Sequence, residues 1–242
     1  MRLVFSVNSF ENDHESILDL LSLGAEHNRV KQYLCSSFDV DINKINGKSR
    51  EEINAYLRPA VYAEYTKAEI PMNEKLAAVS DKWSGVEEDV LKILRVIFGG
   101  DCGEETLRVF LSVNYVCPYD FKNKWIFINY RKTTDEIIEA CIHELIHCYW
   151  FKKWDILFEN SSYDERLARK FSEIAIDAVF KETELEKYCV REKPAHEYFY
   201  DIKIDNENMI GHFRALFSQN NIGGFMKKGM EYLAENRVLI PD

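Results

Sequence analysis

Apolar residues recur every three or four positions in several stretches of the first hundred residues, which is the period of an α-helix. Ser49 and Glu52 have the spacing of a capping box at the start of one stretch. Gly99–Gly100 end another stretch, where a C-terminal glycine is typical. The N-terminal part is therefore expected to be mainly helical. The stretches cover residues 14–34, 49–57 and 86–100.

Residues 107–117 and 125–130 have a different pattern, rich in β-branched and aromatic side chains, which predicts two strands. The segment 118–124 between them predicts a hairpin loop, and residues 3–7 predict one further short strand. We therefore expect a small antiparallel sheet and an α+β fold.

A helical pattern resumes at Thr133, which forms a predicted capping box with Glu136. Ser162 and Glu165 predict another capping box at the start of the next helix. Four helices are predicted in this part of the chain, over residues 133–152, 162–180, 206–217 and 223–236.

The first of these helices contains His143, Glu144 and His147, an HExxH sequence. On a helical wheel the second histidine lies about 40° and the glutamate about 100° from His143, so the three share one face. Cys141 and Cys148 lie across the helix and are interpreted as small core residues. The rest of the wheel is almost wholly apolar, which predicts a buried helix whose polar strip requires partners.

Two imidazoles one turn apart chelate zinc, and the glutamate between them is held beside the metal-bound water as a general base. The alternative is a core helix whose histidines are satisfied by ordinary hydrogen bonds. The uncharged surroundings of the motif and the strand before it favour a zinc site with His143 and His147 as ligands and Glu144 as the catalytic base.

The strand KWIFINY, the HExxH helix and a later helix containing SEIAID resemble the zincin metallopeptidases, specifically the thermolysin-like gluzincin branch. The chain is also similar to bacterial HExxH proteins with no established substrate. The resemblance extends from Trp125 to the C-terminus. It implies one zincin-like domain over residues 1–242, with a helical part (1–103), a hairpin plus zinc helix (104–152) and a helical C-terminal lobe (153–242).

In gluzincins the third zinc ligand is a Glu on a later helix, commonly in an ExxxD pattern whose Asp orients a zinc-bound His. The resemblance therefore implies Glu173 as the third ligand and Asp177 as the residue that supports a ligand. Glu165 is an alternative, because ERLARKF resembles a segment of phage-repressor-cleaving HExxH proteins. His196 and His212 stay open as further alternatives.

Two more features follow from the resemblance. A donor for the developing oxyanion is required, and His196, Tyr198 and Tyr200 are candidates, with no choice among them. Zincins bind an extended peptide along an edge strand, for which residues 125–130 are the candidate here.

Composition narrows the class of protein. The 242-residue chain has a net charge of −10, which argues against a nucleic-acid or anionic-membrane surface. No window approaches the roughly 18 apolar residues of a membrane span. The six scattered cysteines without a CxxC pair, and an N-terminus unlike a secretory signal, are typical of a reduced cytoplasmic protein.

The leading hypothesis is a zinc-dependent peptidase acting on peptides or proteins. A zinc hydrolase of a non-peptide amide is the second, and a low-turnover zinc-binding regulatory or toxin-type protein is the third. An intact Glu144 favours catalysis over the third.

Overall fold

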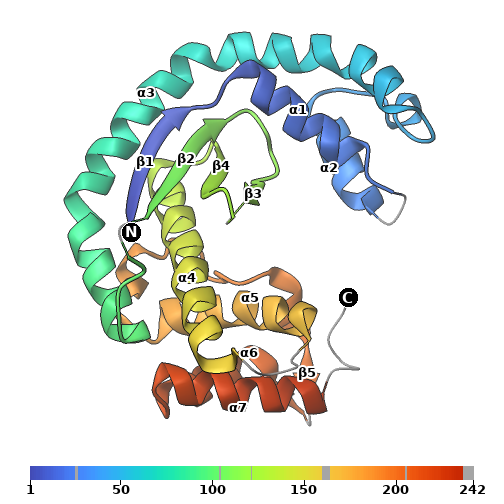
Figure 1. Ribbon diagram of the computed structural model, residues 1–242. Helices are drawn as coiled ribbons and strands as arrows, with labels where there is room; N and C mark the ends of the chain where they lie inside the picture. Colours follow the sequence, from blue (N-terminus) through green and yellow to red (C-terminus); the bar gives the residue numbers. More distant parts are fainter. Residues whose placement is uncertain (25–26, 104, 121, 160–163, 205, 237–242) are drawn as a thin grey trace. The chain divides into compact units, whose positions relative to one another are not determined.

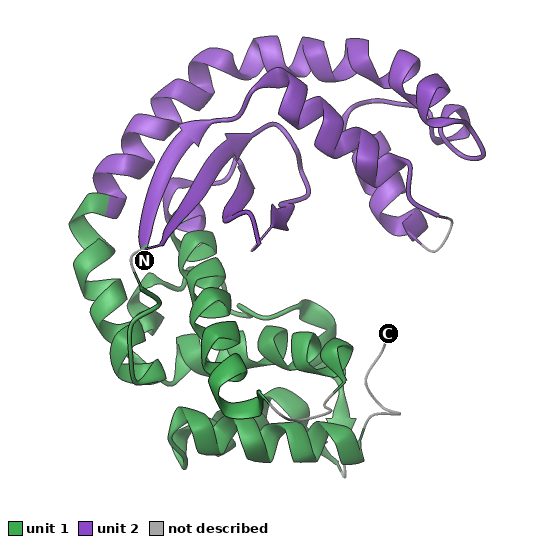
Figure 2. Cartoon of the chain, viewed as in Figure 1, with its two compact units in different colours: residues 1, 84–103, 138–242 green, residues 2–83, 104–137 purple. Residues whose placement is uncertain are grey.

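A computed structural model of the chain describes residues 1–24, 27–103, 105–120, 122–159, 164–204 and 206–236. These residues form seven α-helices, a four-stranded sheet and a two-stranded sheet (Figure 1). The chain divides into two compact units (Figure 2). Unit 1 comprises residues 1, 84–103 and 138–242, and unit 2 comprises residues 2–83 and 104–137.

The sheet of unit 2 has the strand order β1-β2-β4-β3 (Figure 1). The longer strands β1 (Arg2–Val7), β2 (Thr106–Ser112) and β4 (Trp125–Asn129) run parallel to one another. The short strand β3 (Tyr119–Asp120) runs antiparallel to β4. The mixed α+β class and the short N-terminal strand are confirmed, whereas the antiparallel sheet is wrong.

The expected hairpin between residues 107–117 and 125–130 is also wrong. β2 and β4 pair in parallel, with Phe110 opposite Phe127. The predicted hairpin loop contains β3, so the chain first passes to the outer edge of the sheet and then returns as β4. Parallel neighbours need a crossover of about a dozen residues or more, and residues 113–124 provide it.

β4 is an interior strand and not the edge strand expected to bind a peptide. β2 pairs along one side of it, and β3 pairs with Trp125 and Ile126 on the other side. The backbone N–H of Phe127 also donates to the carbonyl oxygen of Pro118 at 2.9 Å. The model in which a substrate adds as a strand to residues 125–130 is therefore wrong.

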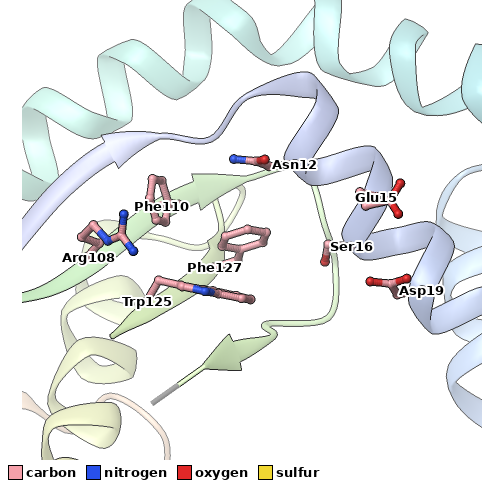
Figure 3. A pocket seen from close by; sticks show the side chains of 8 residues that line it. All are labelled: Asn12, Glu15, Ser16, Asp19, Arg108, Phe110, Trp125 and Phe127. Atoms are coloured by element: carbon pink, nitrogen blue, oxygen red, sulfur yellow. The ribbon is translucent and has the colours of Figure 1, made fainter. Parts of the chain in front are cut away.

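Trp125 and Phe127 of β4 line a groove (Figure 3). Phe127 contacts Trp125 and Phe110, with ring centroids 4.6 and 5.6 Å apart. Helix α1 (Phe10–Leu21) presents polar residues to the groove at the i, i+3, i+4, i+7 spacing of one helix face. These residues are Asn12, Glu15, Ser16 and Asp19.

Unit 2 is completed by α1, α2 (Asn28–Ser37) and residues 50–83 of helix α3 (Arg50–Phe98). The periodic stretch 14–34 thus forms parts of two helices. Apolar residues of all three helices form one core, which includes Ile17, Leu34, Leu57 and Val61, each fully buried.

Helix α3 joins two of the predicted helical stretches, and the 28 residues between them, 58–85, are helical as well. The predicted capping box is present, since Ser49 N donates to the Glu52 carboxylate at 2.9 Å and Glu52 N donates to Ser49 Oγ at 3.3 Å. The helix also ends at a glycine, as predicted. Gly99 has a φ of +71° and its N–H donates to Arg95 O at 2.9 Å.

Unit 1 contains residues 84–98 of α3, most of α4 (Thr134–Phe158), and the helices α5 (Glu165–Lys181), α6 (Met209–Ser218) and α7 (Ile222–Glu235). The four helices predicted after residue 133 are therefore confirmed. Short 3₁₀ segments at Glu184–Tyr188 and Glu197–Asp201, and the pair β5 (Lys203–Ile204) and β6 (Glu207–Asn208), lie between α5 and α6. Buried aromatic rings of Trp150, Phe171, Phe213 and Phe225 pack together in the core.

Helix starts in this part depend on side-chain caps. Thr133 and Glu136 form the predicted capping box, with bonds of 2.7 and 3.2 Å. The predicted cap Ser162 lies outside the described residues, and the N-cap of α5 is Asp164, which accepts from Arg166 N at 2.8 Å. Among the described residues, no helix is both long and apolar enough to cross a membrane.

Candidate metal centre

Helix α4 places the HExxH residues inside unit 1. Both neighbours of the pair His143–Glu144, Ile142 and Leu145, are fully buried. The side chain of His147 is only 3% exposed, and that of His143 is 16% exposed. Their Nε2 atoms lie 3.0 Å apart, so the two imidazoles point at the same place, as four-residue helical spacing requires.

Glu173 of α5 completes the group. Its Oε1 lies 3.3 Å from His147 Nε2, and its Oε2 lies 3.6 Å from His143 Nε2. One ligand atom from each of the three residues lies within 4.8 Å of the others. Glu165 instead lies exposed in the first turn of α5, eight residues before Glu173, and is not part of the group. The ExxxD assignment is thus favoured over the ERLARKF alternative.

The three residues fit a metal ion by both chemistry and spacing. Two imidazoles and one carboxylate are the protein ligands of many catalytic zinc sites, which leave a fourth position open. Ligands about 2.1 Å from a tetrahedral ion are roughly 3.4 Å apart, and the observed separations are 3.0, 3.3 and 3.6 Å. Within the described part of the chain, this group is the one set of three such side chains.

The charges in the group depend on one another. Burial raises the pKa of Glu173, but hydrogen bonds from His143 and His147 outweigh it and hold that pKa well below its usual range. Burial lowers the pKa of His147, yet the Glu173 carboxylate brings it above the usual value. The protein thus stabilises a negative charge on Glu173, which suits a cation.

Glu144 is beside this group and remains available for proton transfer. Burial raises the pKa of its carboxyl group, although the two histidines act in the opposite direction. Its Oε2 is buried and has no hydrogen-bond partner among the described residues. A carboxylate that is buried and unpaired readily accepts a proton, as a general base must.

Asp177 does not have the partner that the resemblance implied. Its buried carboxylate accepts hydrogen bonds from Tyr200 Oη and from Arg214 Nε, the latter at 2.5 Å. His143 Nδ1 is buried with no hydrogen-bond partner among the described residues. The interpretation of Asp177 as the residue that orients a metal-binding histidine is therefore wrong, because Arg214 and Tyr200 are its partners.

The three candidate oxyanion donors differ in their availability. The hydroxyl of Tyr200 donates a hydrogen bond to Asp177 and accepts one from Ala195 N. His196 is exposed, and its Nε2 lies 3.5 Å from Glu173 Oε2. The ring of Tyr198 stacks against His196, with centroids 5.8 Å apart. His196 is therefore the candidate that contacts the metal-binding group, whereas His212 lies beside Glu207 and Tyr232.

Glu139 is a residue of this region that the sequence reasoning missed. It is 1% exposed and accepts hydrogen bonds from the backbone N–H groups of Val190 and Arg191. It lies one turn before His143, about 40° from it on the helical wheel. Its position on the polar face of an otherwise apolar helix is the sequence feature that could have identified it.

The chain was compared with protein-family models, with curated proteins and with solved structures, and it matches none of them.

Proposed function

We propose that the protein is a zinc-dependent metallopeptidase. The observation that supports this most is the group of His143, His147 and Glu173, whose ligand atoms lie within 4.8 Å of one another. Glu144, whose Oε2 is buried, lies beside this group. A site that held zinc only for structure has no use for an unpaired general base, and such sites usually have four protein ligands.

His143, His147 and Glu173 would hold the ion. A bound zinc ion supplies Lewis-acid chemistry, since it polarises a carbonyl group and lowers the pKa of a water molecule. Glu144 would accept a proton from the attacking water at its free Oε2 and return that proton to the leaving amine nitrogen. Burial of Glu144 favours this exchange, because it makes the protonated carboxyl group less costly.

The choice of peptide bonds over other amides depends on the resemblance to gluzincins. The interior position of β4 removes the strand-addition argument for peptides, so a non-peptide amide is the second candidate substrate class. Both classes need the same residues in the same roles, and a panel of substrates separates them.

The test is digestion of a peptide library by zinc-replete protein, with Glu144→Gln as the matched variant. We expect cleavage by the wild type, about 10²–10⁴-fold slower cleavage by the variant, and unchanged zinc content in the variant. Equal rates for the two proteins would contradict the role of Glu144. Cleavage of simple amides without any peptide cleavage would favour the second substrate class.

A further inference from the structure

Two buried carboxylates lie one helical turn away from the metal-binding residues. Glu139 precedes His143 by four residues on α4, and Asp177 follows Glu173 by four residues on α5. Each of these side chains is 1% exposed. Carboxylates buried to this degree require strong hydrogen-bond partners. Both carboxylates have such partners in the segment between α5 and α6, and Asp177 has a further partner in α6 itself.

Glu139 binds the beginning of this segment. Its Oε2 accepts from Val190 N at 2.6 Å and from Arg191 N at 2.9 Å. Its Oε1 accepts from Arg191 Nε. Three donors on one ionised acceptor, two of them backbone groups, fix the backbone of residues 190–191 to helix α4.

Asp177 binds the end of the segment through Tyr200. The Tyr200 hydroxyl donates to Asp177 and accepts from Ala195 N at 3.2 Å. Arg214 donates to Asp177 from Nε at 2.5 Å and from Nη2 at 3.1 Å, which neutralises the buried charge. The residue next to Ala195 is His196, so this network holds the backbone directly before the histidine.

His196 itself is exposed, although the backbone that carries it is anchored. Its side chain is 59% exposed, whereas its neighbours Ala195 and Phe199 are buried. Its Nε2 lies 3.5 Å from Oε2 of Glu173. With Arg191 and Lys193 it lines an open cavity of about 530 Å³.

We propose that Glu139 and Asp177 are positioning residues that fix the segment 190–200, so that His196 is held against Glu173 at the metal centre. This inference depends on the metal site of the proposed function. It gives Asp177 a role that acts through Tyr200 and the backbone, and it gives Glu139 a role outside the HExxH sequence. Residues that support a metal ligand in this way typically change metal affinity by ~10–100-fold.

Hydrogen exchange of the metal-free protein tests the anchoring. Glu139→Gln and Tyr200→Phe remove anchors at opposite ends while keeping the size of each side chain. Asp155→Asn, at an exposed acid of the same helix α4, is the matched control. We expect the amides of residues 190–193, 195 and 196 to exchange at least about tenfold faster in both variants and at the wild-type rate in the control. Wild-type exchange rates in both variants would overturn the anchoring.

Zinc affinity tests whether the anchoring acts through His196. We expect His196→Ala and Tyr200→Phe each to weaken zinc binding by ~10–100-fold, and the double variant to bind no more weakly than His196→Ala. Effects that add in the double variant would overturn the proposal, since they show that Tyr200 acts independently of the histidine. A chain that shows this coupling but cleaves no peptide refutes the proposed peptidase and leaves the positioning role intact.

Discussion

Position along α5 decides which acidic residue serves the metal centre. Glu173 lies at the middle of the helix with its carboxylate near both imidazoles, whereas Glu165 is exposed in the first turn. We expect Glu173→Ala to weaken zinc binding by more than the ~10–100-fold that follows loss of a residue supporting a ligand. Glu165→Ala is the control and should leave zinc affinity unchanged. The opposite order in a competition titration with a chelator would refute this assignment.

The same carboxylate links metal binding to pH. Imidazole must be neutral to bind a metal, and Glu173 raises the pKa of His147 despite its burial. Zinc affinity should therefore fall as the pH decreases through this raised pKa. In the metal-free protein, an NMR titration should place the pKa of His147 above 6.5, the usual value for histidine, and Glu173→Gln should lower that pKa. A wild-type midpoint below 6.5 would contradict the coupling.

The pKa shifts of His147 and Glu173 determine how the stability of the metal-free fold changes with pH. His147 has a raised pKa, so its contribution is complete below the unfolded value of 6.5 and is lost as the pH rises through the folded value. Glu173 has a lowered pKa, so its contribution is present above 4.5 and is lost as the pH falls through the folded value. The pair stabilises the metal-free fold most between pH 4.5 and 6.5.

At the residue scale, short-range spacing predicted more than long-range partners. Four-residue spacing on one helix places the His143 and His147 side chains side by side, and this does not depend on tertiary packing. The same spacing put Asp177 on a face with Glu173 but did not specify what it would meet. Its partner Arg214 lies 37 residues further along the chain, so tertiary packing decides that contact.

At the element scale, the packing of α7 against α5 depends on one glycine. A Cβ atom at Gly229 would lie 2.2 Å from Cζ of the buried Phe171 ring. Gly229→Ala should therefore destabilise unit 1, by about 1–3 kcal/mol as for other overpacked cores. Gly223→Ala in the same helix is the control, because its Cβ would meet nothing closer than 3.6 Å. Urea unfolding measures both, and equal stability of the two variants would contradict the close contact.

Local signals placed the helices well and the strands only in part. Capping boxes at Ser49 and Thr133 and the glycine at residue 99 each act within a few residues, so the sequence shows them directly. Pairing direction between β2 and β4 is not local. The pattern of these strands suits a parallel or an antiparallel neighbour, and the crossover through β3 decides between them.

At the scale of the whole molecule, the three residues that could hold a metal ion all belong to unit 1. The four-stranded sheet belongs to unit 2, and most of helix α4 belongs to unit 1. Two of the points at which the chain passes from one unit to the other lie inside the continuous helices α3 and α4. A boundary inside a continuous helix leaves no compositional sign in the sequence.

We propose that His143, His147 and Glu173 together bind one zinc ion. Native mass spectrometry of zinc-replete protein, alongside His147→Ala, tests it most directly. We predict about one zinc per chain in the wild type, as one site of three protein ligands implies, and none in the variant. A wild type without zinc, or a variant that retains the full amount, would contradict the account.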